Sequence, residues 1–175
     1  QQSSVAAEQM QTLFADWQSA EEDQKSELAE EIVAAGEETI DEFSGMYAAA
    51  RAQLVLGQLA YSQEEYSTAV EHFTTLADSQ PKSYLAPVAL MHAAAAQEKS
   101  GEHENAIAAY QRVREKYSDT FPEVAHALFS IGRLYEELDD RDAALQAYNE
   151  VVDDFSSSNW TNLARDRIIY LETIN

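Results

Sequence analysis

The chain has 175 residues and a formal net charge of −21, from 32 Asp and Glu against 11 Lys and Arg. Such a surface repels nucleic acid and anionic lipid, because both bind through clusters of Lys and Arg; neither is expected as a partner. Hydrophobic residues make up 45% of the chain, with only 5 Gly and 3 Pro, which favours a globular all-α fold over one with many tight turns. No Cys occurs, so disulfides and thiolate metal sites are excluded.

The first 45 residues are predicted to form a pair of helices, over residues 5–18 and 22–42. The first of these is amphipathic through five apolar residues: Val5, Met10, Leu13, Phe14 and Trp17. Residues 1–45 also hold twelve Asp and Glu, with Lys25 as the only basic residue. This acidity indicates either a surface for a basic partner or a solvated helix face, and we favour the second interpretation.

Residues 50–156 contain three segments that align with one another. Each has a small residue in one helix, a second small residue twelve positions later, and an aromatic residue four positions after that. The three sets are Gly57/Ala69/Phe73, Ala94/Ala106/Tyr110 and Gly132/Ala144/Tyr148. Small side chains let antiparallel helices pack at about 8–10 Å, and the aromatic ring fills the space beside the crossing. The pattern therefore predicts three helix pairs, each joined by a short polar turn.

The chain is expected to end in one more helix. After Phe155 a spacer over residues 156–159 leads into residues 160–171, which carry apolar side chains on one side and charged ones on the other. We expect about nine helices in one continuous domain. It would comprise a degenerate helix pair (1–46), three repeats (47–156) and a capping helix (157–175).

The aligned segments resemble the tetratricopeptide repeat (TPR) family, closely over residues 50–156 and loosely over 1–49 and 157–175. The resemblance implies an all-α, right-handed α-α superhelix. The repeat is longer than the family's roughly 34 residues, because Ala69 and Ala106 lie 37 positions apart and Ala106 and Ala144 lie 38 apart. The spacers that hold the surplus are similar to those of bacterial cell-envelope TPR proteins. These include outer-membrane-assembly lipoproteins, Tol-associated proteins and the accessory subunit of the secretion translocon.

The resemblance also implies a binding surface, because the first helix of each pair lines the inner face of a TPR array. A peptide or helix of a partner protein is expected there. The predicted groove residues are Arg51, Leu54, Gln58, Tyr61, Met91, Glu98, His126, Phe129, Arg133 and Glu136, with Arg167 as an addition from the closing helix. The alternative is that these side chains face water or a neighbouring helix. The Lys and Asn of the family's carboxylate clamp are not found at the matching positions, so no clamp is expected.

Enzymatic chemistry is not expected. The sequence has no glycine-rich phosphate loop, nucleophile elbow or His-Glu-x-x-His motif, and its four His are dispersed. No cofactor or metal is expected either. The favoured function is a non-enzymatic scaffold within a bacterial envelope complex. The alternatives are a self-associating module, forming a homo-oligomer through the terminal helix, and an accessory protein that binds a small apolar ligand for transport. Such a ligand would lie among Tyr61, Met91 and Phe129.

Location is predicted from two features of the chain. It begins at Gln1 rather than Met, which we interpret as the first residue of a processed or truncated product with an anchoring segment upstream. No apolar run approaches the roughly 20 residues of a membrane span. Together with the spacers, this indicates the bacterial periplasm or cell envelope, as a lipoprotein or membrane-anchored protein. A cytoplasmic location is the alternative.

Overall fold

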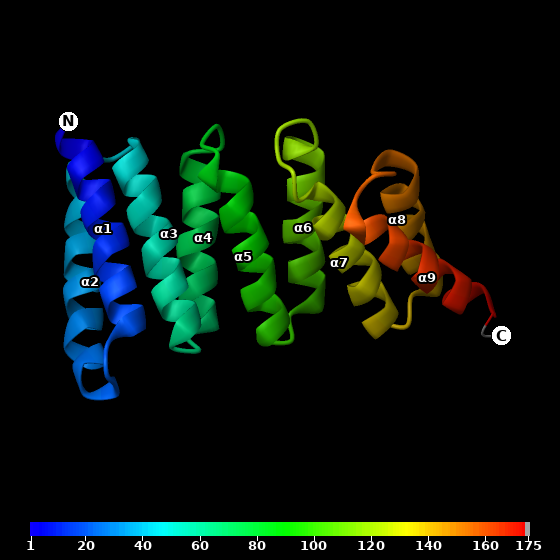
Figure 1. Ribbon diagram of the computed structural model, residues 1–175, viewed down its shortest axis with the longest axis horizontal. Coiled ribbons are helices and arrows are strands. Elements are labelled where there is room, and N and C mark those ends of the chain that lie inside the picture. Colours follow the sequence, from blue (N-terminus) through cyan, green and yellow to red (C-terminus); the bar gives the residue numbers. More distant parts are fainter. Residues whose placement is uncertain (174–175) are drawn as a thin grey trace. The chain divides into compact units, whose positions relative to one another are not determined.

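In the computed structural model, which describes residues 1–173, the regular elements are all helices (Figure 1). They form two compact units, residues 1–100 (unit 1) and the residues from Gly101 onward (unit 2). The helices of unit 1 are α1 (Gln2–Ser19), α2 (Glu22–Glu42), α3 (Tyr47–Ser62), α4 (Tyr66–Ser79) and α5 (Leu85–Lys99). Those of unit 2 are α6 (His103–Tyr117), α7 (Val124–Glu137), α8 (Arg141–Asp154) and α9 (Asn159–Thr173).

The predicted all-α fold is confirmed, with nine helices among the described residues. The predicted repeat limits at residues 46 and 156 fall between helices. The limit between the two units lies inside the second predicted repeat, because it separates α5 from α6. None of the described helices is long and apolar enough to cross a membrane.

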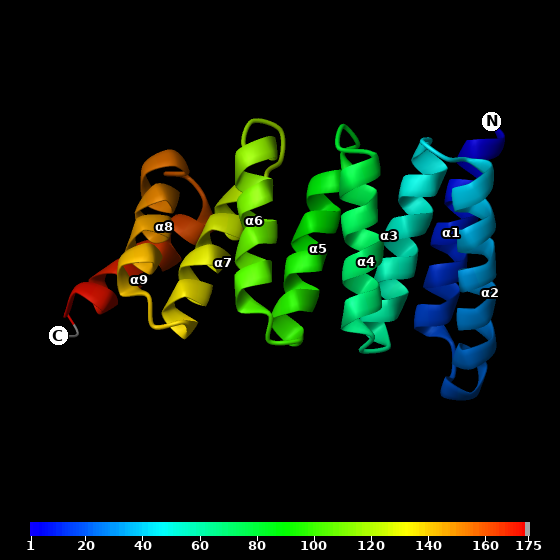
Figure 2. The same cartoon turned by 180° about the vertical axis from the view of Figure 1, so that it is seen from behind.

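Unit 1 has two layers of helices. In Figure 1 α1, α3 and α5 lie on the near side, and Figure 2 shows α2 and α4 from the opposite side. The layers contact each other through α1 and α3 on α2, and through α3 and α5 on α4. The core of the first helix pair, α1 and α2, is apolar, with Met10 and Ile32 fully buried and Trp17 8% exposed. Burial of such side chains stabilises the first helix pair by about 1.5–3 kcal/mol each, although its outer surface is strongly charged.

The predicted crossings of small and aromatic residues are present in both units. A Cβ atom added at Gly57 would lie 2.5 Å from the ring of Phe73, and one added at Gly132 would lie 2.6 Å from the ring of Tyr148. Both rings are fully buried, so only glycine fits at these two positions. The remaining set is divided between the units, with Ala94 in unit 1 and its two companions in unit 2; all three residues are buried.

Each turn within a helix pair contains one residue with a left-handed backbone conformation, and the three residues lie at equivalent positions. These residues are Glu64, Gly101 and Asp139, with φ angles of 63°, 77° and 57°. In the first and third turns the next N–H closes a hydrogen bond five residues back, from Glu65 to Ala60 (2.9 Å) and from Asp140 to Tyr135 (2.8 Å). This is the Schellman ending of a helix, which favours glycine at the left-handed position. At two of the three turns the left-handed residue therefore carries a side chain, although glycine would be less strained there.

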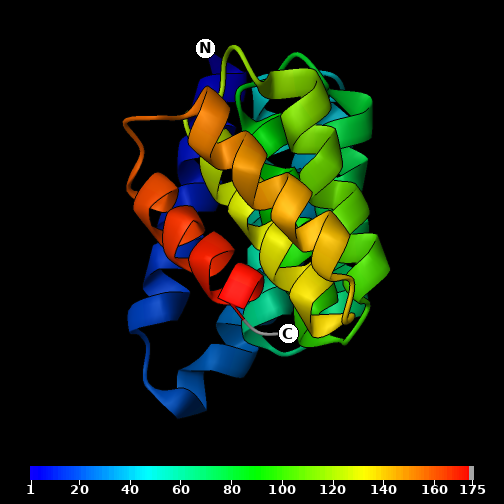
Figure 3. The same cartoon turned by 90° about the vertical axis from the view of Figure 1, so that its right-hand side faces the viewer.

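Unit 2 closes with α9, which packs against α7 and α8 (Figure 3). Its start is fixed by Thr161, whose side chain is buried and donates a hydrogen bond to the carbonyl oxygen of Phe155. The opposite face of α9 leaves three large apolar side chains exposed, namely Leu163 (48%), Ile169 (61%) and Tyr170 (48%). The helix is thus anchored on one side, and its other side exposes these apolar side chains together with Asn162 and Asp166.

Candidate protein-binding site

A pocket of about 240 Å³ lies in unit 1, on the side formed by α1, α3 and α5, the first helices of their pairs. We call it the inner pocket. It is lined by residues of α1, α3, α4 and α5, namely Phe14, Gln18, Gln58, Tyr61, Ser62, Phe73, His92 and Ala95. Three of these four helices are the first helices of successive pairs, so the pocket occupies the side on which the sequence predicts a binding surface.

The base of the inner pocket is aromatic. Phe73 is fully buried, and the ring of His92 stacks on it with centroids 5.3 Å apart and planes 23° apart. Burial lowers the pKa of His92 below its ordinary value, because a charged imidazolium is poorly solvated there. His92 is therefore neutral near pH 7, and the pocket base carries no charge.

The rim of the inner pocket is polar but uncharged. It includes the amides of Gln18 and Gln58 and the hydroxyl of Ser62. The Ser62 hydroxyl donates to the backbone carbonyl of Gln58 (2.9 Å), whereas the two amides can donate and accept toward a bound molecule. No Asp, Glu, Lys or Arg lines this pocket. Such a pocket suits an apolar group flanked by hydrogen-bonding groups.

Four other predicted groove residues of unit 1 do not line the inner pocket. Leu54 is only 3% exposed and belongs to the core, so its predicted role as a surface anchor was wrong; it lies on the packed side of α3. Arg51 donates through Nε to the hydroxyl of Tyr47 (3.1 Å) and lies over its ring. Met91 and Glu98 are half-buried elsewhere on α5. Of the six predicted residues in unit 1, the structure brings Gln58 and Tyr61 together at the pocket.

In unit 2 two predicted groove residues lie in an aromatic cluster that joins three helices. The ring of His126 stacks on that of Trp160 at 4.2 Å, with planes 2° apart. Phe129 contacts Trp160 at 5.2 Å and Tyr148 at 5.3 Å between centroids. His126 thus packs on α9, and Phe129 packs on both α8 and α9. Contact with a neighbouring helix is the alternative that the sequence left open.

The other two predicted groove residues of unit 2 form ion pairs. Arg133 donates to Glu137 (2.8 Å). Glu136 accepts from Nε of Arg167 (3.0 Å) and from the hydroxyl of Tyr148 (2.5 Å). Burial alone would raise the pKa of Glu136, but the hydrogen bonds from Arg167 and Tyr148 hold it below its ordinary value. Glu136 therefore stays ionised and fastens α9 to α7, so this carboxylate has an internal structural partner.

Six of the eight residues that line the inner pocket are absent from the predicted groove set, among them Phe14, Gln18 and His92. Phe14 and Gln18 lie four positions apart on one face of α1, and His92 lies on α5 beside the predicted Met91. The four-residue spacing of Phe14 and Gln18 is the sequence signal that could have placed them on a shared helix face. Only the packing of α1 on α3 shows that this face meets the repeat, and α1 lies outside the three aligned segments.

Comparison with known proteins adds a family and a fold. A family profile described as a tetratricopeptide repeat-like domain matches residues 1–170. A TPR repeat-containing protein of Treponema pallidum (strain Nichols) is 32% identical over 123 residues, which are 70% of this chain and 51% of that protein. The chain thus spans about half the length of this relative.

Solved structures agree on the fold. Two structures of nearly identical TPR-like repeats, described as from a kinesin light chain of Podosopora anserina, superpose with TM-scores of 0.74 and 0.73 at 13% and 14% identity. They cover 98% and 97% of this chain, and in each case 86% of the other. TPR repeats generally mediate protein–protein interaction and are typically non-enzymatic scaffolds. From the repeat pattern, the helix packing and the profile match, we conclude that this chain belongs to the tetratricopeptide repeat-like domain family.

Proposed function

We propose that this protein is a non-enzymatic scaffold that binds a segment of a partner protein, with the inner pocket receiving one apolar side chain of that segment. The observation that carries the proposal is the convergence of α1, α3 and α5 on an uncharged pocket with an aromatic base. Its volume of about 240 Å³ is below the roughly 300–1,000 Å³ of sites for drug-sized molecules. A single side chain of a docked segment fits that size better than a free ligand does.

We extend the proposal to a basic segment around the apolar anchor, which takes the acidity of unit 1 as a surface for a basic partner and not only as a solvated helix face. Unit 1 holds 17 Asp and Glu against 4 Lys and Arg, and none of these charges lines the pocket. The surrounding field attracts Lys and Arg of a partner and accelerates encounter. The pocket itself selects the uncharged anchor between them, so recognition would combine salt-dependent attraction with a salt-independent contact.

A photo-crosslinking experiment tests this proposal. A benzophenone amino acid placed at Tyr61 in the living source cell should capture a partner, identified by mass spectrometry. The Ala95→Leu substitution should abolish capture, because it fills the pocket. The matched control is the same crosslinker at Tyr84, which is 67% exposed in the same unit and lies outside the inner pocket. Equal capture from both positions, or capture that survives Ala95→Leu in a folded protein, would refute the assignment.

We also propose that the protein acts in the bacterial cell envelope, in the periplasm and tethered to a membrane. The spacers that hold the surplus of the repeat, at residues 81–87 and 118–122, support this location through their resemblance to those of envelope TPR proteins. The relative from Treponema pallidum supports a bacterial source. Fractionation of the source cells with a specific antibody tests it. Recovery in the cytosolic fraction, free of membranes, would contradict the proposal.

Self-association is a second candidate function, favoured by one observation. The outer face of α9 exposes Leu163, Ile169 and Tyr170, and unpaired apolar faces are typical of interfaces. Light scattering over a range of protein concentrations should then show mass increasing with concentration, and Ile169→Glu should remove the increase. A protein that stays monomeric throughout would eliminate this candidate.

A further inference from the structure

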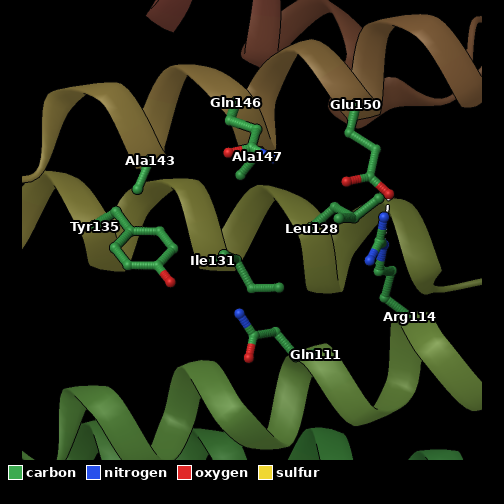
Figure 4. Close-up of a pocket in the computed structure, with 9 residues that line it drawn as sticks. All are labelled: Gln111, Arg114, Leu128, Ile131, Tyr135, Ala143, Gln146, Ala147 and Glu150. Atoms are coloured by element: carbon green, nitrogen blue, oxygen red, sulfur yellow. Dashed lines mark hydrogen bonds and ion pairs between the residues drawn. The ribbon is translucent and has the colours of Figure 1, made fainter.

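Unit 2 contains a second cavity, which opens on the side formed by the second helices of its pairs. It lies between α6 and α8, which are the second helices of their pairs, with α7 as its floor (Figure 4). We call it the outer cleft. Its volume is about 150 Å³, and all the residues that line it belong to unit 2. It is therefore separate from the inner pocket and from the proposed function of that pocket.

The floor of the outer cleft is apolar. Leu128 and Ile131 of α7 form it, and Ala147 of α8 closes one side with a small side chain. All three are nearly buried, at 2%, 4% and 6% exposure. A volume of about 150 Å³ is that of a benzene-sized group, although the outer cleft is partly open to solvent and has polar walls. The space thus matches one leucine or a group of similar size.

The walls of the outer cleft are polar, and their charges cancel. At one end Nε of Arg114 donates to Oε1 of Glu150 (2.5 Å), joining α6 to α8 across 36 positions of sequence. Elsewhere Gln111 reaches from α6 toward Ile131, and the hydroxyl of Tyr135 points into the same space (Figure 4). Gln146 of α8 adds a second amide to the lining. No other charged side chain lines the cleft, so its lining is neutral although the chain carries a net charge of −21.

The amide side chains indicate what kind of group would bind. Within residues 1–173 no hydrogen bond engages the side-chain amides of Gln111, which is half-buried, and Gln146, which is exposed to solvent. A glutamine amide both donates and accepts, and so does a peptide bond. A helix satisfies its own backbone groups, whereas an extended segment presents free N–H and C=O groups that these amides can pair with. The neutral lining disfavours a charged occupant, because no unpaired charge in the cleft would offset its desolvation.

We propose that the outer cleft binds an uncharged, extended segment of a partner protein, with one leucine-sized side chain on the floor of Leu128 and Ile131. The amides of Gln111 and Gln146 pair with the backbone on either side of that anchor. The cleft is too small for a drug-sized ligand, for which roughly 300–1,000 Å³ is usual. It gives the protein a second docking site, formed by the second helices of its pairs.

Nuclear magnetic resonance with a defined probe tests the proposal. The probe is N-acetyl-leucine methylamide, a single blocked residue with a peptide bond on each side. Titration into the full chain should move the side-chain amide resonances of Gln111 and Gln146 in a saturable way. The dissociation constant should be of millimolar order, as expected for so few non-hydrogen atoms. The lysine and glutamate analogues should bind at least tenfold more weakly.

Matched variants separate the cleft from the rest of the surface. Ala147→Leu fills the cleft and should abolish the shifts; because Ala147 is nearly buried, circular dichroism first establishes that the variant is folded. Ala108→Leu makes the same change on α6 at an exposed residue outside the cleft and should leave binding intact. The proposal is overturned by binding that survives Ala147→Leu, by equal binding of the charged analogues, or by no saturable shift well above millimolar concentration. Shifts confined to Gln18 and Gln58 would also overturn it, while supporting the inner pocket.

Discussion

At the scale of single residues, two glycines set how closely the paired helices approach. Gly57 and Gly132 lie directly against the buried rings of Phe73 and Tyr148. An aromatic ring cannot shorten or rotate away as the tip of a flexible chain can. The cost of a methyl group at these positions is therefore expected to exceed the gain in helix propensity that alanine brings.

Gly57→Ala should lower the free energy of unfolding by about 1–3 kcal/mol, the usual cost of overpacking a core. Urea unfolding followed by circular dichroism measures it. Adding Phe73→Leu should offset part of the loss, so that the two substitutions are not additive. Gly36→Ala provides a comparison, since an added Cβ there meets the side chain of Leu56 at 2.9 Å, which is more flexible than a ring. If Gly57→Ala proves neutral, the close crossing is not as the structure has it.

Glu136 is the charged residue on which the attachment of α9 depends. Its folded pKa is lowered, so it binds fewer protons in the folded than in the unfolded protein. Its stabilisation is therefore complete above the unfolded pKa, roughly 4.3, and is lost as the pH falls toward the folded value.

Glu136→Gln should destabilise the protein by about 1.5–3 kcal/mol near pH 7, the range for hydrogen bonds to charged groups. The difference from the unsubstituted protein should shrink in acid. Hydrogen exchange of α9 should increase more than that of α6. The control is Glu137→Gln, because the Glu137 side chain is 42% exposed and surface ion pairs contribute little. A constant difference from neutral to acidic pH would contradict the assigned role.

At the scale of elements, the turns between paired helices explain how one repeat tolerates different sequences. The chain adopts the same left-handed backbone conformation at Glu64, Gly101 and Asp139. The left-handed conformation costs a non-glycine residue about 1–2 kcal/mol. The turns at Glu64 and Asp139 are nonetheless kept because they close the Schellman hydrogen bonds and align the next helix.

Glu64→Gly and Asp139→Gly should each stabilise the protein, by up to about 1 kcal/mol, since relief of strain exceeds the added entropy of the unfolded chain. Differential scanning calorimetry of the two variants tests this. The reverse substitution, Gly101→Glu, should lower the melting temperature. Destabilisation by both glycine variants would mean that the side chains themselves hold these turns.

Much of the fold could be predicted from sequence because its signals are local and repeated. Gly57 and Phe73 lie 16 positions apart in a pattern that recurs at Gly132 and Tyr148, so the helix pairing was readable. The binding surface could be predicted less well. Helical spacing placed Leu54 on the same face as Gln58, but it could not show which part of that face the next helix covers. The pairing of Glu136 with Arg167 joins residues 31 positions apart, for which no sequence motif exists.

At the scale of the whole molecule, repulsion among acidic side chains opposes the folded state. The net charge is −21, and α2 alone exposes Glu30, Glu31, Glu37 and Glu38. The distance over which such charges interact falls from about 30 Å at 0.01 M salt to about 10 Å at 0.1 M. Added salt should thus relieve the repulsion.

Sodium chloride should raise the melting temperature by a few degrees between low and physiological ionic strength, measured by circular dichroism. A variant with Glu30, Glu31, Glu37 and Glu38 changed to Gln should melt higher at low salt and respond less to its addition. A melting temperature that falls with salt would show that attractive ion pairs outweigh the repulsion. The binding of a basic partner should weaken over the same range, which separates the two effects.

The two tryptophans of the chain are divided between the units in different surroundings. Trp17 is nearly buried in unit 1 and its indole N–H donates to the carbonyl oxygen of Lys25 (3.1 Å), whereas Trp160 of unit 2 is half-buried under the His126 ring. Replacing either one with Phe leaves a single tryptophan, in the other unit, which can be excited selectively at wavelengths that the nine tyrosines do not absorb. The native sequence therefore carries its own optical reporters, and the unfolding of each half can be recorded separately without any attached dye.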